Sequence, residues 1–394
     1  MAFGCASFGL ILGVGFLVLA ALITWLSLKV LAILALDYKD SKPSFYSVSS
    51  DLMPKARWVI DAALVINCFG GCICYVQTMG KLMTEGMLAI FDWDTNAWST
   101  DNMTIVIQLG ILAFLTPLCM MKEITATKIP NMVGLACIVY IVTMTFFYTP
   151  CTALSVDLLK PGDVVKSFAA FPAFIFAYAC QQNVFSVSNE IKDVNMKKLN
   201  TVSICSTLTG FVIYLPIMIL PYMTFGASIK SNYLYNFVEE YKTAGLPIPI
   251  IIAFICASLS VSISYVLLMQ PVRCSIMSLI FGDNQPTGRK ERVIRMGLAL
   301  VLIALSFALA YVAGEAVDLP VSIAGLLGGN TMCFVMPFLL YLKKYGFDRS
   351  NKFTLLVSAT LVFCILLYPI CLSGIVYKEV TKAAAVATTT TTTP

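Results

Sequence analysis

The sequence predicts an all-α membrane protein with about ten transmembrane helices. Of its 394 residues, 59% are hydrophobic and only 12% are charged, whereas a soluble domain carries about 25% charged residues. The apolar residues also come in long blocks, and about 20 mainly apolar residues are enough to cross a bilayer. On length alone the chain could form about two or three soluble domains, but this composition could not cover their cores with polar surface.

The predicted spans follow one another with short polar stretches between them. Helix is expected in each, because backbone exposed to lipid must satisfy its own hydrogen bonds. Transmembrane strands would instead give short segments of alternating polarity. The ten spans are expected at residues 8–36, 58–91, 104–121, 131–149, 165–188, 201–227, 247–281, 293–312, 319–342 and 353–377.

The loop charges support this division and orient it. Of the 26 lysines and arginines, 17 fall in alternate loops, at residues 37–57, 122–130, 189–200, 282–295 and 343–352. The opposite loops and the C-terminal tail hold six, and Lys29, Lys81 and Arg273 lie within spans. An excess of basic residues marks cytoplasmic loops, so the five basic loops are predicted to face the cytoplasm.

This topology makes a prediction about each end of the chain. Ten spans place both termini on the external face, and a further span ahead of residue 1 would return the N-terminus to the cytoplasm, so we expect the sequence to be shortened there. At the other end, residues 381–394 are rich in alanine and threonine, a composition that cannot form a packed core. We therefore expect a transmembrane domain over residues 1–380 and a disordered tail over 381–394.

Several function classes lack any supporting pattern. Histidine is absent, and the 14 cysteines are scattered without pairs at metal-binding spacing. No nucleotide-binding loop, nucleophile–base arrangement or nucleic-acid signature is present. We expect no enzyme activity, no catalytic residues, no metal site and no nucleic-acid partner.

The fifth predicted span, 165–188, carries the most informative polar residues. Gln181, Gln182 and Asn183 are three consecutive amides in mid-membrane, which is costly unless they face partners, water or ligand. Pro172 removes one helical donor upstream. The pattern is typical of a helix broken at mid-depth to offer backbone groups to a polar substrate. It is equally consistent with amides that hold two helices together.

Two other spans contain polar or small residues in a pattern. In span 247–281, Ser258 and Ser262 share one helix face. Serine oxygens beside a broken helix would suit a hard cation, although membrane serines more often bond the preceding helical turn. In span 319–342, the glycines at 325, 328 and 329 precede Asn330 and allow close backbone approach or local unwinding.

Several short motifs together resemble the amino acid/auxin permease family, also called the transmembrane amino acid transporter family. The resemblance runs across nearly the whole chain and is carried by the order and spacing of the motifs. They are Phe176-Ala177-Tyr178-Ala179-Cys180-Gln181 with Asn189-Glu190-Ile191, Tyr222-Met223-Thr224-Phe225-Gly226, Pro271-Val272-Arg273, and Gly328-Gly329-Asn330-Thr331 with Met336-Pro337-Phe338-Leu339-Leu340-Tyr341-Leu342-Lys343.

The resemblance implies an eleven-helix inverted-repeat transporter fold of the APC/LeuT-like type. Two inverted five-helix repeats are followed by one extra helix, and substrate binds between unwound stretches of helices one and six. The first span here would then be helix two, so the glycine-rich unwound half of helix one is expected to be missing. Gln181 stands where many members carry a histidine.

The same resemblance implies roles for individual residues. Side chains and backbone carbonyls of the fifth span would line the substrate cavity, and two serines of the seventh would form part of a cation site. The substrate-lining residues are Ala173, Phe174, Ala177, Tyr178 and Gln181, and the coupling-ion residues are Ser258 and Ser262. No cofactor is implied beyond a coupling cation, H⁺ or Na⁺.

The expected function is secondary active transport of amino acids by alternating access, coupled to protons or sodium. Two alternatives stay open: a non-transporting amino-acid sensor, and an inactive permease truncated at its N-terminus. The expected partners are an amino acid and the lipid bilayer. The plasma membrane is the expected location, while the identity of the amino acid and the oligomeric state are left open.

Overall fold

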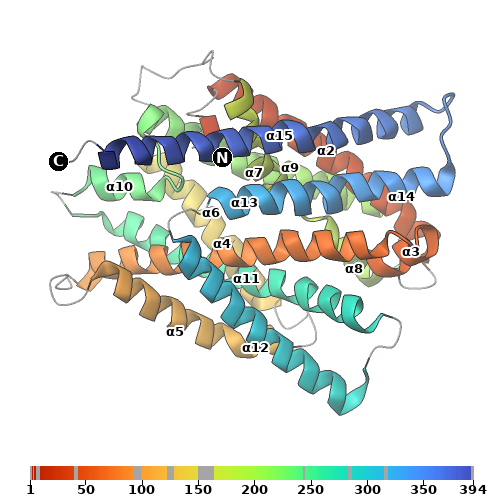
Figure 1. The fold of residues 1–394 in the computed structure, drawn as a ribbon, viewed down its shortest axis with the longest axis horizontal. Helices are drawn as coiled ribbons and strands as arrows, with labels where there is room; N and C mark the ends of the chain where they lie inside the picture. The colour runs from red at the N-terminus through yellow and green to blue at the C-terminus, as the bar shows by residue number, and fades with distance from the viewer. Residues whose placement is uncertain are drawn as a thin grey trace.

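The computed structural model describes residues 2, 4–5, 9–39, 43–91, 99–121, 128–149, 164–242, 245–282, 286–314 and 318–391. Within these ranges every regular element is helical (Figure 1). The elements are α2 (Leu10–Asp37), α3 (Phe45–Leu52), α4 (Arg57–Phe91), α5 (Thr100–Met120), α6 (Lys128–Tyr148), α7 (Val164–Ala177), η3 (Gln181–Asn183), α8 (Val184–Glu190), α9 (Met196–Phe225), η4 (Gly226–Ser228), α10 (Leu234–Glu240), α11 (Ile248–Phe281), α12 (Gly288–Ala313), α13 (Asp318–Ile323), η5 (Ala324–Val335), α14 (Met336–Tyr345) and α15 (Lys352–Thr391).

The predicted all-α membrane architecture is confirmed. Among the described residues, nine helical segments are long and apolar enough to cross a membrane. They coincide with nine of the ten predicted spans, with ends that differ by a few residues. The remaining span, predicted at 165–188, is divided between α7, η3 and α8, none of which is long enough to cross alone.

Local sequence determines where several helices begin and end. Ser99 precedes α5 and accepts a hydrogen bond from the backbone N–H of Asn102, and Asn195 caps α9 in the same way through Lys198. Side-chain oxygens at these positions satisfy N–H groups that the first helical turn leaves unpaired. Glycine ends another helix: α11 stops at Gly282, whose φ of 54° is readily adopted only by glycine.

The arrangement of helix ends agrees with the orientation predicted from charge. The spanning helices run roughly along the long axis of the molecule (Figure 1). The short helix α3 and the end of α14 lie on the right of that view, where they contact each other. Both belong to basic, predicted cytoplasmic loops, whereas α10, from a predicted external loop, lies on the left.

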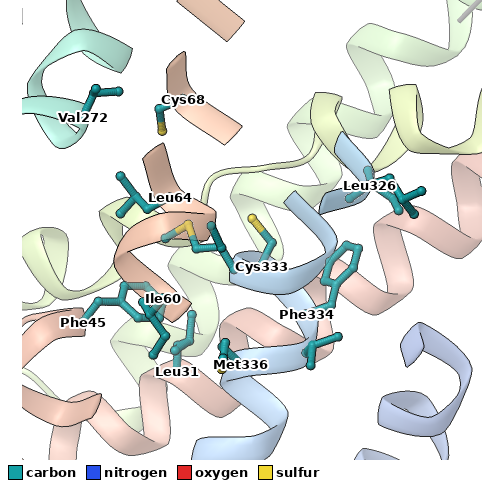
Figure 2. Packing of buried hydrophobic residues seen from close by; sticks show 14 of the residues in the cluster. Leu31, Phe45, Ile60, Leu64, Cys68, Val272, Leu326, Cys333, Phe334 and Met336 are labelled. Carbon is teal, nitrogen blue, oxygen red and sulfur yellow. The ribbon is translucent and has the colours of Figure 1, made fainter. Parts of the chain in front are cut away.

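The main core lies among α2, α4, α7, α11 and η5. Figure 2 shows part of it: Leu31 of α2, Ile60 and Cys68 of α4, and Cys333 and Phe334 of η5 gather in one cluster of buried side chains. Water exclusion is not the force that joins helices within lipid, where close packing stabilises the contacts instead. Small residues in these helices permit that packing.

The C-terminal helix extends beyond its predicted span. It is helical through Thr391, which differs from the disordered tail expected at 381–394. Alanine is the strongest helix former, and residues 383–385 are alanines that continue directly from the spanning part of α15. The domain boundary at residue 380 stays a prediction.

Candidate functional site

The fifth predicted span is interrupted, as the sequence predicts. α7 ends at Ala177, and a short 3₁₀ segment begins at Gln181. At the end of α7, the backbone N–H of Tyr178 bonds the carbonyls of Phe174 (3.3 Å) and Ile175 (3.2 Å), and the N–H of Ala179 bonds that of Phe176 (3.2 Å). We call residues 178–183 the break.

Proline does not itself break the helix. Pro172 lies inside α7, which continues for five more residues. A proline removes only its own N–H bond to the carbonyl four residues before it, and the rest of the ladder closes around it. The interruption comes where the amide triplet begins.

The structure brings the predicted substrate-lining residues to the end of α7 and to the break. Phe174, Tyr178 and Gln181 are buried, and Ala173 and Ala177 are half-buried. Phe16 of α2 packs edge-on against Phe174, with ring centroids 6.2 Å apart. The apolar side of the candidate site therefore includes α2, a contact that the sequence did not predict.

Gln181 has an unused donor. Its Oε1 accepts a hydrogen bond from the backbone N–H of Cys180 at 2.9 Å. Its Nε2 is buried, and it has no hydrogen-bond partner among the described residues. An unpaired buried donor costs about 1–3 kcal/mol. An amide held at such a cost beside a broken helix is a good candidate for a group that meets a ligand.

A tyrosine of α9 reaches the end of α7. The hydroxyl of Tyr214 donates a hydrogen bond to the carbonyl of Ala177 at 2.9 Å. Its ring lies edge-on to that of Tyr178, with centroids 5.4 Å apart. The hydroxyl of Tyr178 is buried and has no partner in the described part of the chain. Sequence inspection missed Tyr214, since nothing in its local pattern distinguishes it from other aromatic residues of the span.

Two glycines of the wide π-helix η5 lie directly against other backbones. A Cβ at Gly325 would stand 2.2 Å from the carbonyl oxygen of Pro172, and one at Gly328 would stand 2.4 Å from the backbone nitrogen of Asn67. The predicted close approach at these glycines is confirmed. These two contacts hold η5 tightly between α4 and α7, next to the break. We call them the glycine clamp.

The two predicted coupling-ion serines lie between α11 and α4. Ser258 donates a hydrogen bond to the carbonyl of Met79 at 2.8 Å, and Ser262 donates one to the carbonyl of Ser258 at 2.7 Å. Both side chains are buried. These contacts are of the structural kind that the sequence left open, and they join the serines to α4. The cation role stays a prediction.

Two apolar hollows lie away from the break. One of about 420 Å³ is bounded by α6 and α9, including Thr143 and Pro216. The other, of about 300 Å³, lies between η5 and α15. Neither is lined by the residues of the break.

The described residues contain no group of three or more histidine, cysteine, aspartate or glutamate side chains that could hold a metal ion. The polar groups at the break are the amides of residues 181–183, the Tyr178 hydroxyl, the Cys180 thiol and backbone carbonyls. The amides, the hydroxyl and the carbonyls can hydrogen-bond a polar ligand.

Comparison with known proteins gives the family. The family model described as transmembrane amino acid transporter protein matches residues 1–380. The chain is 25% identical to vacuolar amino acid transporter 6 of Saccharomyces cerevisiae over 71% of this chain and 62% of that protein. It is 24% identical to vacuolar amino acid transporter 5 of Schizosaccharomyces pombe over 84% of this chain and 77% of that protein.

A human protein is also similar over a shorter stretch. Sodium-coupled neutral amino acid transporter 4 of Homo sapiens is 27% identical over 44% of this chain and 30% of its own length. Thus the chain spans less than two thirds of the length of both the human and the budding-yeast protein.

Proposed function

The chain belongs to the transmembrane amino acid transporter family, and we propose that it is a secondary active transporter that moves amino acids across a membrane by alternating access. It is an integral multi-pass membrane protein and not an enzyme. The observation that carries the proposal is the broken helix α7–η3–α8. Transporters use discontinuous helices at mid-membrane to present backbone groups to substrate and ions.

The break offers groups that suit the polar part of an amino acid. An ammonium group needs acceptors, and the C-terminal end of a helix provides carbonyl oxygens and the negative end of the helix dipole. A carboxylate needs donors, and the free Nε2 of Gln181 is one. Ala173, Phe174, Ala177 and Tyr178 supply the wall around these groups. We propose that these four residues and Gln181 line the substrate site.

Tyr214 already uses one of these acceptors. Its hydroxyl occupies one of the two lone pairs of the Ala177 carbonyl, so we expect it to compete with a substrate ammonium for that oxygen. We expect Tyr214→Phe to lower the KM for uptake about fivefold, because one competing hydrogen bond is worth about 1 kcal/mol. Radiolabelled uptake into proteoliposomes measures this.

The matched control for that variant is Tyr140→Phe. Tyr140 also donates its hydroxyl to a backbone carbonyl, that of Pro249, at 3.0 Å, but on the α6–α11 contact. It should lose similar stability and keep the wild-type KM. An unchanged or raised KM in Tyr214→Phe would show that the hydroxyl does not compete with substrate.

At the predicted cytoplasmic face the ends of α2 and α14 are joined by several contacts. Lys344 forms an ion pair with Asp37 at 2.8 Å and lies over the ring of Tyr38, 4.2 Å from its centroid. Tyr345 also donates to Asp37. Burial, with the hydrogen bond to Asp51, raises the pKa of Tyr38 to about 12. Alternating access requires these contacts to separate when the cytoplasmic side opens.

For the coupling cation we propose a site that includes Ser258 and Ser262. A hydroxyl that donates its proton keeps its oxygen lone pairs, so the observed hydrogen bonds leave both oxygens able to face a cation. In uptake assays, we expect Ser262→Ala to raise the half-saturating Na⁺ or H⁺ concentration about tenfold.

Ser264→Ala is the control for this substitution, because Ser264 makes the same kind of bond to the carbonyl of Ser260 at 2.9 Å. A general effect of lost serine bonds would shift cation dependence equally in both variants, and that result would remove the serines from the proposed site.

The direct test of the function is uptake by purified protein in proteoliposomes. A panel of amino acids is offered with an imposed proton gradient, a sodium gradient or neither. Accumulation that requires a gradient supports coupled transport. Saturable binding without uptake would instead identify a sensor, one of the two alternatives that the sequence left open, and neither binding nor uptake would favour the other, an inactive permease.

The compartment belongs to the same proposal. The expected plasma membrane location is not supported by the relatives, since the two fungal proteins are named as vacuolar. We therefore propose an internal membrane of the vacuolar kind as the better-supported location. Fractionation of cells that express the tagged protein distinguishes the two.

A further inference from the structure

An arginine is buried inside the protein near the cytoplasmic ends of three helices. Arg273 of α11 is only 3% exposed. Its Nη2 donates a hydrogen bond to the carbonyl of Met121, the residue that ends α5, at 2.9 Å. Its Nε and Nη1 are buried and find no hydrogen-bond partner in the described part of the chain.

A second guanidinium group lies close by on α12. Arg295 lies on α12, which packs against α11 and α5 (Figure 1), so the two arginines lie on neighbouring helices. Arg295 forms a long pair of 3.6 Å with Glu291, one turn away on its own helix. Its Nε and Nη1 also make no hydrogen bond to a described residue. Among the described residues, Glu291 is the carboxylate that pairs with Arg295, and none is hydrogen-bonded to Arg273.

Such an arrangement is costly without an anion. A buried charge is tolerated when it is paired and its donors are satisfied, and an uncompensated one is strongly destabilising. In the described part of the chain the hydrogen-bond partner of Arg273 is the carbonyl of Met121, and a neutral carbonyl does not balance the charge of a guanidinium group. The guanidinium fork matches the oxygens of a phosphate group, with which it forms strong charge-assisted bonds.

The position of the pair fits a membrane surface. The loops after α5 and α11 are two of the basic loops predicted to face the cytoplasm, and Arg295 lies within the first two turns of α12. Anionic phospholipids are enriched in that leaflet, and basic pockets between helices on that side bind their head groups. We propose that Arg273 and Arg295 form a binding site for a phosphate group between the cytoplasmic ends of α5, α11 and α12.

The phosphate group could come from a lipid head group or from a soluble anion, and the test separates these sources. Purified full-length protein is placed in nanodiscs of phosphatidylcholine alone, or with phosphatidic acid added, and inorganic phosphate is titrated into the first. Thermal stability and native mass spectrometry report binding. Stabilisation by phosphatidic acid alone assigns the site to lipid, and stabilisation by inorganic phosphate as well assigns it to phosphate groups in general.

Variants make the assignment specific. Arg295→Gln should weaken phosphatidic acid binding about tenfold, because it removes direct charge-assisted bonds to the phosphate as well as one surface charge. Arg292→Gln, at an exposed arginine of the same helix, removes only a surface charge and should weaken binding no more than about fivefold. Equal losses in both variants would show a general surface effect and would overturn the site.

Arg273→Met gives a second test, in which the change in melting temperature should differ in sign between membranes without and with phosphatidic acid. Without an anion, removing an unpaired buried charge should raise the melting temperature above that of the wild type. With phosphatidic acid present, the order should reverse, because the wild type gains a partner and the variant does not. A variant that is less stable than wild type in both membranes would mean that the protein itself satisfies Arg273, and the proposal would fail.

Discussion

Replacing Gly328 with alanine is expected to abolish transport and to lower the melting temperature more than any other single methyl addition we propose. The new Cβ would stand 2.4 Å from the backbone nitrogen and 2.6 Å from the Cα of Asn67. Neither atom can move without shifting α4. Overpacking costs about 1–3 kcal/mol even where side chains can adjust, and here the two helix backbones must part.

The matched control is Gly297→Ala on α12, where an added Cβ meets nothing within 4 Å. It should be neutral or more stable by up to about 1 kcal/mol, because alanine favours helix more than glycine does. A thiol-reactive dye can follow unfolding of both variants, since many of the free cysteines are buried.

A second pair of variants separates a backbone clash from a side-chain clash. A Cβ at Gly80 would stand 2.1 Å from Cγ of Gln108. Gly80→Ala should therefore be rescued by Gln108→Ala, which removes the obstructing atoms. Gly328→Ala should not be rescued by Asn67→Ala, because the obstructing atoms belong to the backbone. Rescue in both pairs would mean that η5 moves easily, and it would contradict the tight packing of η5 between α4 and α7.

Sequence reasoning reached those features that depend on nearby residues. Hydropathy and loop charge give the spans, because the bilayer acts on each segment separately. The amide triplet at 181–183 locates the break within a few residues, since polar groups in lipid demand local compensation. The glycines before Asn330 indicate that another helix backbone packs closely there, because glycine has no Cβ to keep it away.

The partners of these features could not be predicted. Gly325 meets Pro172, and Tyr214 reaches Ala177, but both contacts join distant parts of the chain and depend on how helices pack. Arg273 illustrates the same limit. The sequence places it within a span, and only the fold shows that its side chain is buried and bonds the carbonyl of Met121 rather than extending to the cytoplasmic surface.

The second large effect is expected at Gln181, because its free Nε2 is the donor we assign to the substrate carboxylate. Gln181→Leu keeps the size of the side chain and removes that donor. A substrate carboxylate left without its partner should reduce kcat/KM for uptake about tenfold to a hundredfold, the equivalent of about 1–3 kcal/mol. Initial uptake rates over a range of substrate concentrations measure the loss.

A buried glutamine elsewhere shows what a purely structural amide does. Gln77 of α4 donates through Nε2 to the carbonyls of Ala310 (3.2 Å) and Gly314 (3.0 Å). Gln77→Leu should therefore lower stability while the folded fraction keeps the wild-type KM. Gln181→Leu should do the reverse, with at most a small loss of stability, from the uncapped Cys180 N–H, and a large loss of uptake.

A hydrogen-bond donor can also be restored at position 181. Gln181→His supplies an N–H at this position, and it should recover part of the lost uptake. If Gln181→His and Gln181→Leu are equally inactive yet folded, size and not hydrogen bonding decides activity at this position. If Gln181→Leu transports normally, the unpaired Nε2 is not a substrate contact, and the binding site must be sought elsewhere along the break.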